Sequence, residues 1–504
     1  MKEKSKSEQF CHDILNMNVN RYRPLANAVM ALASATEAQS VVQLSKSEIF
    51  HYHYSNLTKI MTDISFDEQS YESLIQEVNL VISRYIPPIR KEEGTEFYGF
   101  TTDTTKIIKA HSPTLEGRTY VPIANNAIKG NKPVGIGYPV SCLHLNPFEQ
   151  GQGGWCPPMT VERLTATRNA IEAGAKALMS VMTDKTLPFG DSLCLHKADT
   201  SYGQAAFLSP THEAANLVNI VRLRASSKIY QSESDTQTGG APKIYGQKWY
   251  LIPETDTKTY FKKGVAYTVE RDSIMDLPCS EHISLELELS NGRKVVVELF
   301  RWNDLKIRSK NGNSMKDKPL DIIRCVVKDA ETKELVFVRP LFIALCGKRK
   351  SETSTTLAYF QYCERYDVEP FYRFAKQSML LDSFQTSDVG HLDNWLAVWT
   401  LAVWLLLTAS SETQAQPEVW EKYLSVYKEK TVENEITDVL TIAQTRKAAH
   451  TLFSTFDPNP FLPQKYKKGK GRQKGDTLTP KPKFDVVKKE KKIPICKLKC
   501  QKNE

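Results

Sequence analysis

The amino-acid sequence predicts an α/β fold with a mixed sheet, a β-rich insertion, and helical N-terminal and C-terminal parts. Between residues 95 and 224, short apolar runs alternate with helical patterns, the order typical of a mixed sheet covered by helices. Residues 244–345 are strongly β in pattern, whereas 1–90 and 355–450 show helical apolar spacing. At 504 residues the chain is long enough for several domains.

The helical N-terminal part, residues 1–90, contains one clear start signal. Ser45 to Glu48 fits a capping box, in which two side chains satisfy the first free N–H groups of a helix, and the helix is expected over 49–61. This pattern suits a helix-turn-helix DNA reader and equally a bundle that only packs, and both remain open. Pro87 and Pro88 then predict a linker.

The next part, residues 95–224, holds the predicted sheet. Strands are expected at 97–102, 133–145, 154–161, 193–198 and 216–223, with a helix at 162–182 where Ala, Leu and Met recur at helical spacing. The first strand ends on Asp103, and the strand at 193–198 ends on Asp199. Two strands of the predicted sheet are therefore each followed by an aspartate.

A stretch rich in Ser, Thr and Gly at 225–243 predicts a boundary before the β-rich block. The clearest element there is 282–300, where apolar and polar residues alternate on both sides of Asn291-Gly292. An Asn-Gly pair between alternating runs is a strong hairpin signal. The sequence therefore predicts a β-hairpin at this position.

The C-terminal part contains an apolar run and a basic tail. The run Trp395–Ala409 is shorter than the ~20 residues that cross a bilayer, so a buried core helix is expected rather than a base-stacking platform. Residues 465–504 hold 15 Lys or Arg and 4 Asp or Glu, against 67 and 58 in the whole chain. We expect the tail, 464–504, to be disordered without a partner and to contact DNA phosphates without sequence preference; a purely solubilising role is the alternative.

Cysteine usage and the first residues indicate the compartment. Ten Cys are scattered without a C-x-x-C pair, which suits a reducing interior better than a disulfide framework. The first ten residues contain no apolar stretch, so no signal peptide is expected. The prediction is a soluble cytoplasmic protein with no membrane partner.

The strongest chemical pattern is Tyr362-x2-Arg365-x3-Glu369-x6-Lys376. On one continuous helix, at about 100° per residue, these four side chains fall within roughly 60° of one another. A carboxylate can hold a divalent metal while Arg and Lys grip phosphates, although mixed charge at this spacing is also typical of an ion-paired surface helix. If the helix instead begins at Pro370, Tyr362 and Arg365 belong to a preceding turn.

This spacing, matched without a gap, resembles the signature of a large group of bacterial insertion-sequence DDE transposases. The resemblance runs from about residue 95 to the tail, and more weakly through the N-terminal helices. Short sequence motifs, in the same order as in that family, carry the resemblance: TTDTT (101–105), KGNKP (129–133), HKADTSY (196–202), NLVNIVRLR (216–224) and RYDVEPFYRFAKQSMLLDSFQT (365–386).

The resemblance implies an RNase H-like catalytic core with a β-rich insertion between its second and third catalytic residues. Asp103, Asp199 and Glu369 match the catalytic carboxylates, which bind two Mg²⁺ ions, and Mn²⁺ is expected to substitute. Tyr362, Arg365 and Lys376 are expected to hold and position DNA (the signature's residues do so in similar enzymes). The predicted partners are transposon terminal inverted repeats and target DNA, with a homodimer in the end complex.

The predicted chemistry explains these residue types. Phosphodiester cleavage and strand transfer are in-line displacements in which one metal activates the attacking oxygen and the other steadies the leaving oxygen. Carboxylates are hard oxygen ligands that suit Mg²⁺, so His196, close to Asp199, is expected to be incidental. Asp184 and Asp191 lie in a turn-like stretch and are expected to be solvated.

Two other functions remain open. A nuclease with the same fold would hydrolyse DNA without joining it. A decayed or domesticated transposase would bind DNA without cutting, although the intact acidic triad argues against decay.

Overall fold

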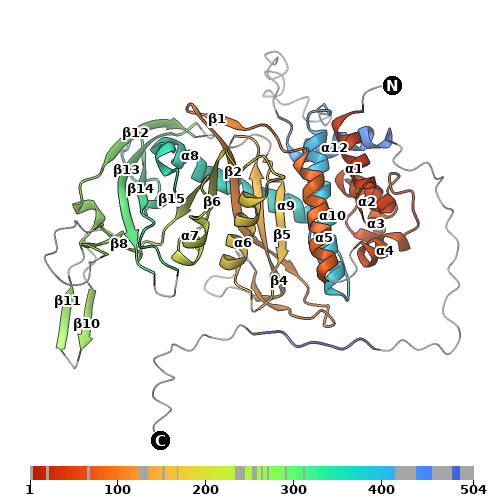
Figure 1. Cartoon of the computed structure of the whole chain (residues 1–504), viewed down its shortest axis with the longest axis horizontal. Helices are drawn as coiled ribbons and strands as arrows, with labels where there is room; N and C mark the ends of the chain where they lie inside the picture. The colour runs from red at the N-terminus through yellow and green to blue at the C-terminus, as the bar shows by residue number, and fades with distance from the viewer. Residues whose placement is uncertain are drawn as a thin grey trace, which may run out of the picture.

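The structure, a computed structural model, describes a set of ranges: 4–18, 22–64, 68–123, 134–149, 154–166, 168–232, 244–251, 258–262, 265–269, 272–289, 292–309, 313–414, 439–456 and 480–488. The predicted mixed α/β class is confirmed, because a large mixed sheet runs through the molecule. Figure 1 shows helices gathered at one end of this sheet and a β-rich part at the other. KGNKP at 129–133 lies outside the described residues.

Five strands form the central part of the sheet: β2 (Thr95–Ile108), β4 (Val134–Asn146), β5 (Pro158–Arg163), β6 (Leu193–Ala198) and β7 (Leu217–Arg222). They lie in the order β5-β4-β2-β6-β7. β2, β6 and β7 are parallel to one another, whereas β4 is antiparallel to both its neighbours. The predicted strand 193–198 is confirmed residue for residue.

Helices cover both faces of this central sheet. Leu193 and Leu195 of β6 pack with Leu357 of α8 (Thr355–Glu364), whereas Cys194 and Ala198 belong to the core cluster on the opposite face. α6 (Ala170–Thr183) and α7 (Ala205–Thr211) cover that opposite face. A strand buried on both faces is apolar at successive positions, which explains why β6 shows no alternation.

The β-rich part continues the same sheet. β15 (Leu341–Gly347) pairs with β7, and β14 (Leu320–Asp329), β13 (Lys294–Ile307) and β12 (Glu281–Glu288) follow in turn, all antiparallel. The predicted hairpin is confirmed by the pairing of β12 with β13. Gly292 has φ of 78°, which favours glycine, and Asn291 lies outside the described residues.

Several short elements complete the described sheet and its surroundings. They are β1 (Arg90–Glu92), β3 (Thr119–Pro122), β8 (Lys228–Tyr230), β9 (Lys248–Tyr250), the pair β10 (Lys258–Lys262) and β11 (Val265–Val269), and the 3₁₀ turns η1 (Ile274–Asp276) and η2 (Lys350–Glu352). Figure 1 shows β10 and β11 projecting from the β-rich end. The second half of the predicted boundary, 233–243, lies outside the described residues.

Helix α10 (Val389–Ala409) is the centre of the helical part. It contacts β5 and five helices: α1 (Lys6–Leu15), α2 (Tyr22–Ser34), α4 (Ser55–Asp63), α5 (Glu68–Ser83) and α12 (Ile442–Ser454). Within the described residues it is the one helix long and apolar enough to cross a membrane, yet 94% of its apolar window is buried inside the fold. The prediction of a core helix is confirmed, as in a soluble protein. The N-terminal helices pack around it. Whether they also bind DNA as a helix-turn-helix stays a prediction.

Two predicted helices have different boundaries in the structure. The helix predicted over 49–61 is α4, which begins only at Ser55 and ends at Asp63. Ser45 instead follows α3 (Val41–Leu44) and donates to the carbonyl of Val42, so the predicted capping box at Ser45 is wrong. The predicted helix 162–182 starts late, at the cap Asn169, because residues 158–163 pair with β4 as a strand instead.

One segment of the basic tail is ordered, contrary to the prediction of disorder over 464–504. The N–H of Phe484 donates to the carbonyl of Pro113 (2.9 Å), and the N–H of Val487 donates to that of Arg118 (2.8 Å). The Thr119 hydroxyl donates to the Val487 carbonyl at 3.0 Å. Residues 480–488 therefore dock beside the short strand β3, and the rest of the tail lies outside the described residues.

Candidate functional site

The register of β2 and β6 places the two predicted aspartates beside each other. Thr102 of β2 is the last residue paired with β6, opposite Ala198, and each is followed by an aspartate, Asp103 and Asp199. β2 does not end there, contrary to the prediction, because it continues to Ile108 by pairing with β4. Asp103 therefore lies within a strand, whereas Asp199 directly follows one.

The pKa of Asp103 depends on the charges of the other predicted site residues. The pKa of Asp103 rises from 3.8 to about 6, chiefly because of burial; the charges of Asp199 and Glu369 add to the rise, while the Thr104 N–H and the Arg365 guanidinium oppose it. The carboxylate of Asp103 accepts from the Thr104 N–H at 2.8 Å, and that of Asp199 accepts from the Ser201 N–H at 2.8 Å. The charges of Asp199 and Glu369 therefore both act on the carboxyl group of Asp103.

The predicted signature lies on a broken helical segment rather than on one helix. Tyr362 is in α8, Arg365 begins the 3₁₀ turn η3 (Arg365–Asp367), and Glu369 and Lys376 lie in the first and last turns of α9 (Val368–Gln377). The predicted single face is therefore interrupted at η3. The alternative start at Pro370 is two residues late, because proline is tolerated anywhere in a first helical turn that lacks N–H partners.

Exposure differs widely among the signature residues. The Glu369 side chain is 60% exposed, whereas that of Arg365 is only 9% exposed. Arg365 Nη2 lies 3.9 Å from Glu369 Oε1. Tyr362 is fully buried, and its ring lies 5.8 Å from the Arg365 guanidinium carbon. The Nε of Arg365 is buried without a hydrogen-bond partner. The guanidinium carbon lies closer, at 4.3 Å, to the ring of Tyr366, so Arg365 is held by two tyrosine rings.

Lys376 lies at the other end of α9 from Glu369. Burial lowers its pKa, and the nearby positive charge of Lys106 acts in the same direction, while Asp382 opposes both. The side chain is neither fully buried nor fully exposed. It is therefore a cation at the edge of the site rather than at its centre.

The sequence analysis missed a buried contact that anchors α9 to β4. His144 Nδ1 lies 2.7 Å from the Cys156 carbonyl, which only accepts, so Nδ1 carries the proton. Its Nε2 then accepts from the Tyr372 hydroxyl at 2.9 Å. Burial lowers the pKa of His144 to about 4, so the ring is neutral. Tyr372 follows Glu369 by three residues, which was its only sequence signal, and no pattern marked His144.

The residues expected to be incidental have other partners. His196 is fully buried and hydrogen-bonds Asn219 at 2.8 Å and Thr102 at 2.7 Å, and burial lowers its pKa to about 3. Asp184 accepts from the N–H of Thr186 at 2.8 Å in an exposed turn after α6. Asp191 is exposed.

The donor chemistry of Asp103, Asp199 and Glu369 fits a hard divalent cation, because three carboxylates that repel one another gain from a shared positive charge. Among the residues that the structure describes, no three His, Cys, Asp or Glu side chains form a ready-made metal site.

No family model matches the chain, and no curated protein matches it.

Proposed function

We propose that this protein is a Mg²⁺-dependent DDE transposase that cleaves DNA at transposon ends and joins it to a target. The observation that carries the proposal is that the parallel pairing of β2 and β6 brings Asp103 and Asp199 next to each other. The charge of Glu369 also raises the pKa of Asp103. The strand order β5-β4-β2-β6-β7, followed by the helical segment that carries Glu369, is the order expected of an RNase H-like core. In this proposal the β-rich part is its insertion.

Each site residue has a role in the proposal. Asp103, Asp199 and Glu369 hold two Mg²⁺ ions, with Mn²⁺ as a substitute. The ions supply activation of the attacking oxygen and stabilisation of the leaving oxygen. Arg365, which lies 3.9 Å from Glu369, grips a phosphate near the cleaved bond together with Lys376. Tyr362 holds Arg365 in place.

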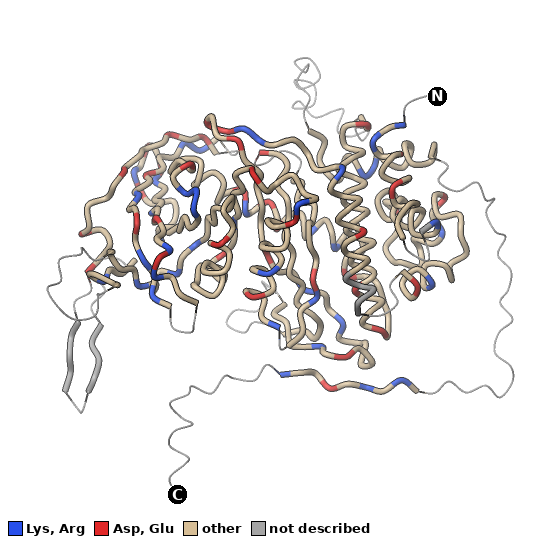
Figure 2. Tube along the Cα trace, viewed as in Figure 1, with Lys and Arg blue, Asp and Glu red and all other residues tan. Residues whose placement is uncertain are grey.

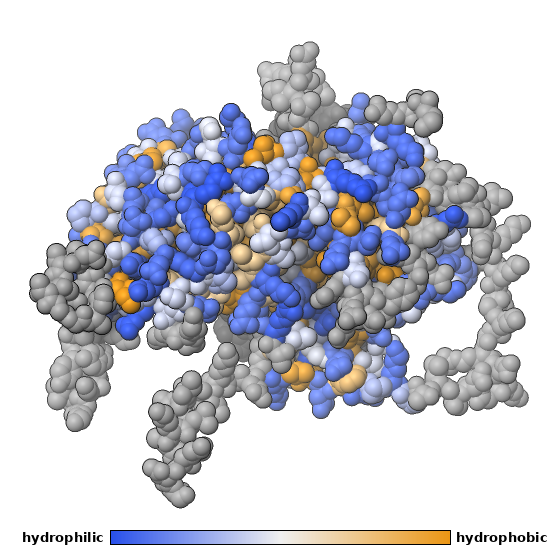
Figure 3. Space-filling view, in the orientation of Figure 1, coloured by the Kyte–Doolittle hydropathy of each residue, from blue (hydrophilic) through white to orange (hydrophobic). Residues whose placement is uncertain are grey.

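The proposed partners are terminal inverted repeats and target DNA, bound by a homodimer in the cytoplasm without a membrane. The basic tail is the proposed sequence-independent DNA contact. In Figure 2 Lys and Arg are interspersed with Asp and Glu over the body, and Figure 3 shows a mostly hydrophilic face with small apolar patches. The excess positive charge of the sequence lies in residues 465–504, which suits sequence-independent phosphate contact.

The experiment is cleavage of a labelled duplex that carries the element's own terminal repeat, with Mg²⁺ and with chelator. Asp103→Ala, Asp199→Ala and Glu369→Ala are each expected to lose cleavage by about 10³-fold or more while binding the duplex almost normally, because affinity comes mainly from phosphate contacts. Asp184→Ala and Asp191→Ala are the controls and should cut normally. A triad variant that cuts at nearly the wild-type rate would remove that residue from the site.

A further inference from the structure

A buried cluster of charges lies beside the proposed site, and we name its members, Arg90, Glu92, Lys197, Gln361 and Glu364, the Glu364 cluster. Lys197 of β6 is fully buried. Its ammonium donates to the carboxylate of Glu364 and to the side-chain oxygen of Gln361, both at 2.9 Å. Strand β6 is therefore joined to helix α8 by an ion pair shielded from water.

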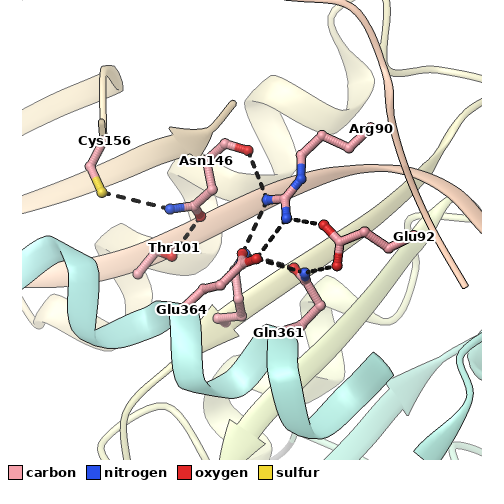
Figure 4. A network of polar contacts seen from close by, with 8 residues as sticks. Arg90, Glu92, Thr101, Asn146, Cys156, Gln361 and Glu364 are labelled. Carbon is pink, nitrogen blue, oxygen red and sulfur yellow. Dashed lines mark hydrogen bonds and ion pairs between the residues drawn. The ribbon is translucent and has the colours of Figure 1, made fainter. Parts of the chain in front are cut away.

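Arg90 extends this cluster to two further strands. Its guanidinium donates to both carboxylate oxygens of Glu364, at 2.6 and 3.1 Å, and to the backbone carbonyl of Asn146 in β4 at 3.2 Å. Figure 4 shows Arg90 between Asn146, Glu364 and Glu92. Because Arg90 and Lys197 face Glu92 and Glu364, the cluster holds two charges of each sign. Glu364 thus links α8 to β1 and β6, and Arg90 connects this pair to β4.

Strand β2 leaves room for the two cations. A Cβ at Gly99 would lie 3.0 Å from the Lys197 ammonium and 3.3 Å from an Arg90 guanidinium nitrogen. Real Cβ contacts are rarely that short. A side chain at Gly99 would therefore push the cations away from Glu364.

The position of the cluster relates it to the proposed chemistry. Lys197 precedes Asp199 by two residues, and Glu364 directly precedes Arg365, with Glu369 one turn further along. A buried ion pair costs desolvation that its attraction barely repays, so it is a poor source of stability, but breaking it leaves an uncompensated charge. Its directional hydrogen bonds fix the two elements in one relative geometry.

We propose that the Lys197–Glu364 ion pair, with Arg90, is a positioning device that fixes the start of α9 relative to β2 and β6. Glu369 and Arg365 are thereby held within reach of Asp103 and Asp199. The inference rests on the proposed function for its meaning, but its structural part is testable without DNA. In this proposal they are positioning residues, because they act through the placement of Glu369 and Arg365.

The test compares Lys197→Met and Glu364→Gln with a matched control, Asp321→Asn. Asp321 pairs with Arg301 at 2.6 Å, is equally buried, and lies in β14, away from α9. The first measurement is hydrogen exchange of α9 in the protein without metal or DNA. Exchange over 368–377 should rise at least about tenfold in the first two variants relative to α10, and not in Asp321→Asn.

The second measurement is the Mg²⁺ concentration for half-maximal cleavage. It should rise about tenfold in Lys197→Met and Glu364→Gln, with duplex binding unchanged, and stay at the wild-type value in Asp321→Asn. If either variant fails to fold, Gly99→Ala replaces it, because it displaces the cations without removing a charge. Its expected effects are the same and smaller.

The outcomes separate the two proposals. Unchanged exchange of α9 in the folded variants, or an equal rise in Asp321→Asn, overturns the positioning role even if wild-type protein cuts DNA. A wild-type protein that cuts no DNA refutes the proposed function, whereas the exchange of α9 still decides whether the cluster fixes that helix.

Discussion

At the residue scale, Asp103 combines partial burial with two neighbouring negative charges, and its pKa rises from 3.8 to about 6. The folded protein therefore holds a proton at Asp103 more tightly than the unfolded chain does. By linkage, stability falls as the pH rises from about 4 to 6, and the full penalty remains above that range. A divalent cation at the site would remove the penalty.

The variant Asp103→Asn tests this penalty, because asparagine does not ionise. In chelator near pH 7.5, the variant should melt at a higher temperature than wild type, and the difference should vanish near pH 4. Mg²⁺ should raise the melting temperature of the wild type but not that of the variant. Thermal unfolding over this pH range, with Asp184→Asn as control, measures both effects. An equal response of Asp103→Asn and wild type to Mg²⁺ would contradict a metal-binding role for Asp103.

Arg365 and Lys376 belong to a second prediction at this scale. If they grip phosphates, Arg365→Ala and Lys376→Ala should weaken assembly with end DNA and slow cleavage together, by about tenfold or more, and excess Mg²⁺ should not restore either. Arg373→Ala, an exposed cation on the same helix, is the control. Binding and cleavage are measured on one labelled duplex. Restoration by Mg²⁺ would mean that they support the carboxylates instead.

The candidate site was predictable only where local sequence carried a signal. The assignment of Asp103, Asp199 and Glu369 came from the resemblance to a transposase family, which short motifs in the sequence carry. Arg90 and Glu364 are 274 residues apart, so no local pattern joins them. The same holds for His144 and Tyr372, 228 residues apart. Charge pairing across the core becomes visible only once the strands are in register.

At the element scale, predictions succeeded where the local sequence alone determines the secondary structure of a segment. β6, the hairpin β12–β13 and α10 are marked by their own apolar patterns. β2 is longer than predicted because its second half depends on its partner β4. The helix predicted over 49–61 begins later, as α4 at Ser55, because Ser45 bonds the Val42 carbonyl at the end of α3 instead of starting a helix.

The docked tail segment gives a prediction for one element. Val487→Pro removes the N–H that binds the Arg118 carbonyl, so residues 480–488 should detach, whereas Val487→Ala keeps that N–H. Val487 is 40% exposed, so losing its side chain matters little. Tryptic cleavage after Lys483 and Lys488 should become several-fold faster in Val487→Pro than in Val487→Ala. Equal rates in both variants and the wild type would show that the segment is not held on β3 in solution.

At the scale of the whole molecule, one continuous sheet connects the proposed catalytic strands to the β-rich part. β7 pairs with β15, so the elements on either side of the β-rich block are held together by backbone hydrogen bonds. Residues 225–243 suggested a separate β domain, because composition marks a change in the chain but not which strand edges meet. The helices at the other end pack on β5 through α10.

The most direct test of the central claim is strand transfer, because it separates a transposase from a nuclease. The substrate is a duplex of the element's terminal repeat with a free 3′-OH, incubated with a supercoiled plasmid, Mg²⁺ and wild-type or Asp199→Ala protein. Joined products are resolved on a gel. The account predicts that wild-type protein joins the end to the plasmid and that Asp199→Ala does not. Plasmid hydrolysis without joining, or equal joining by both proteins, would contradict it.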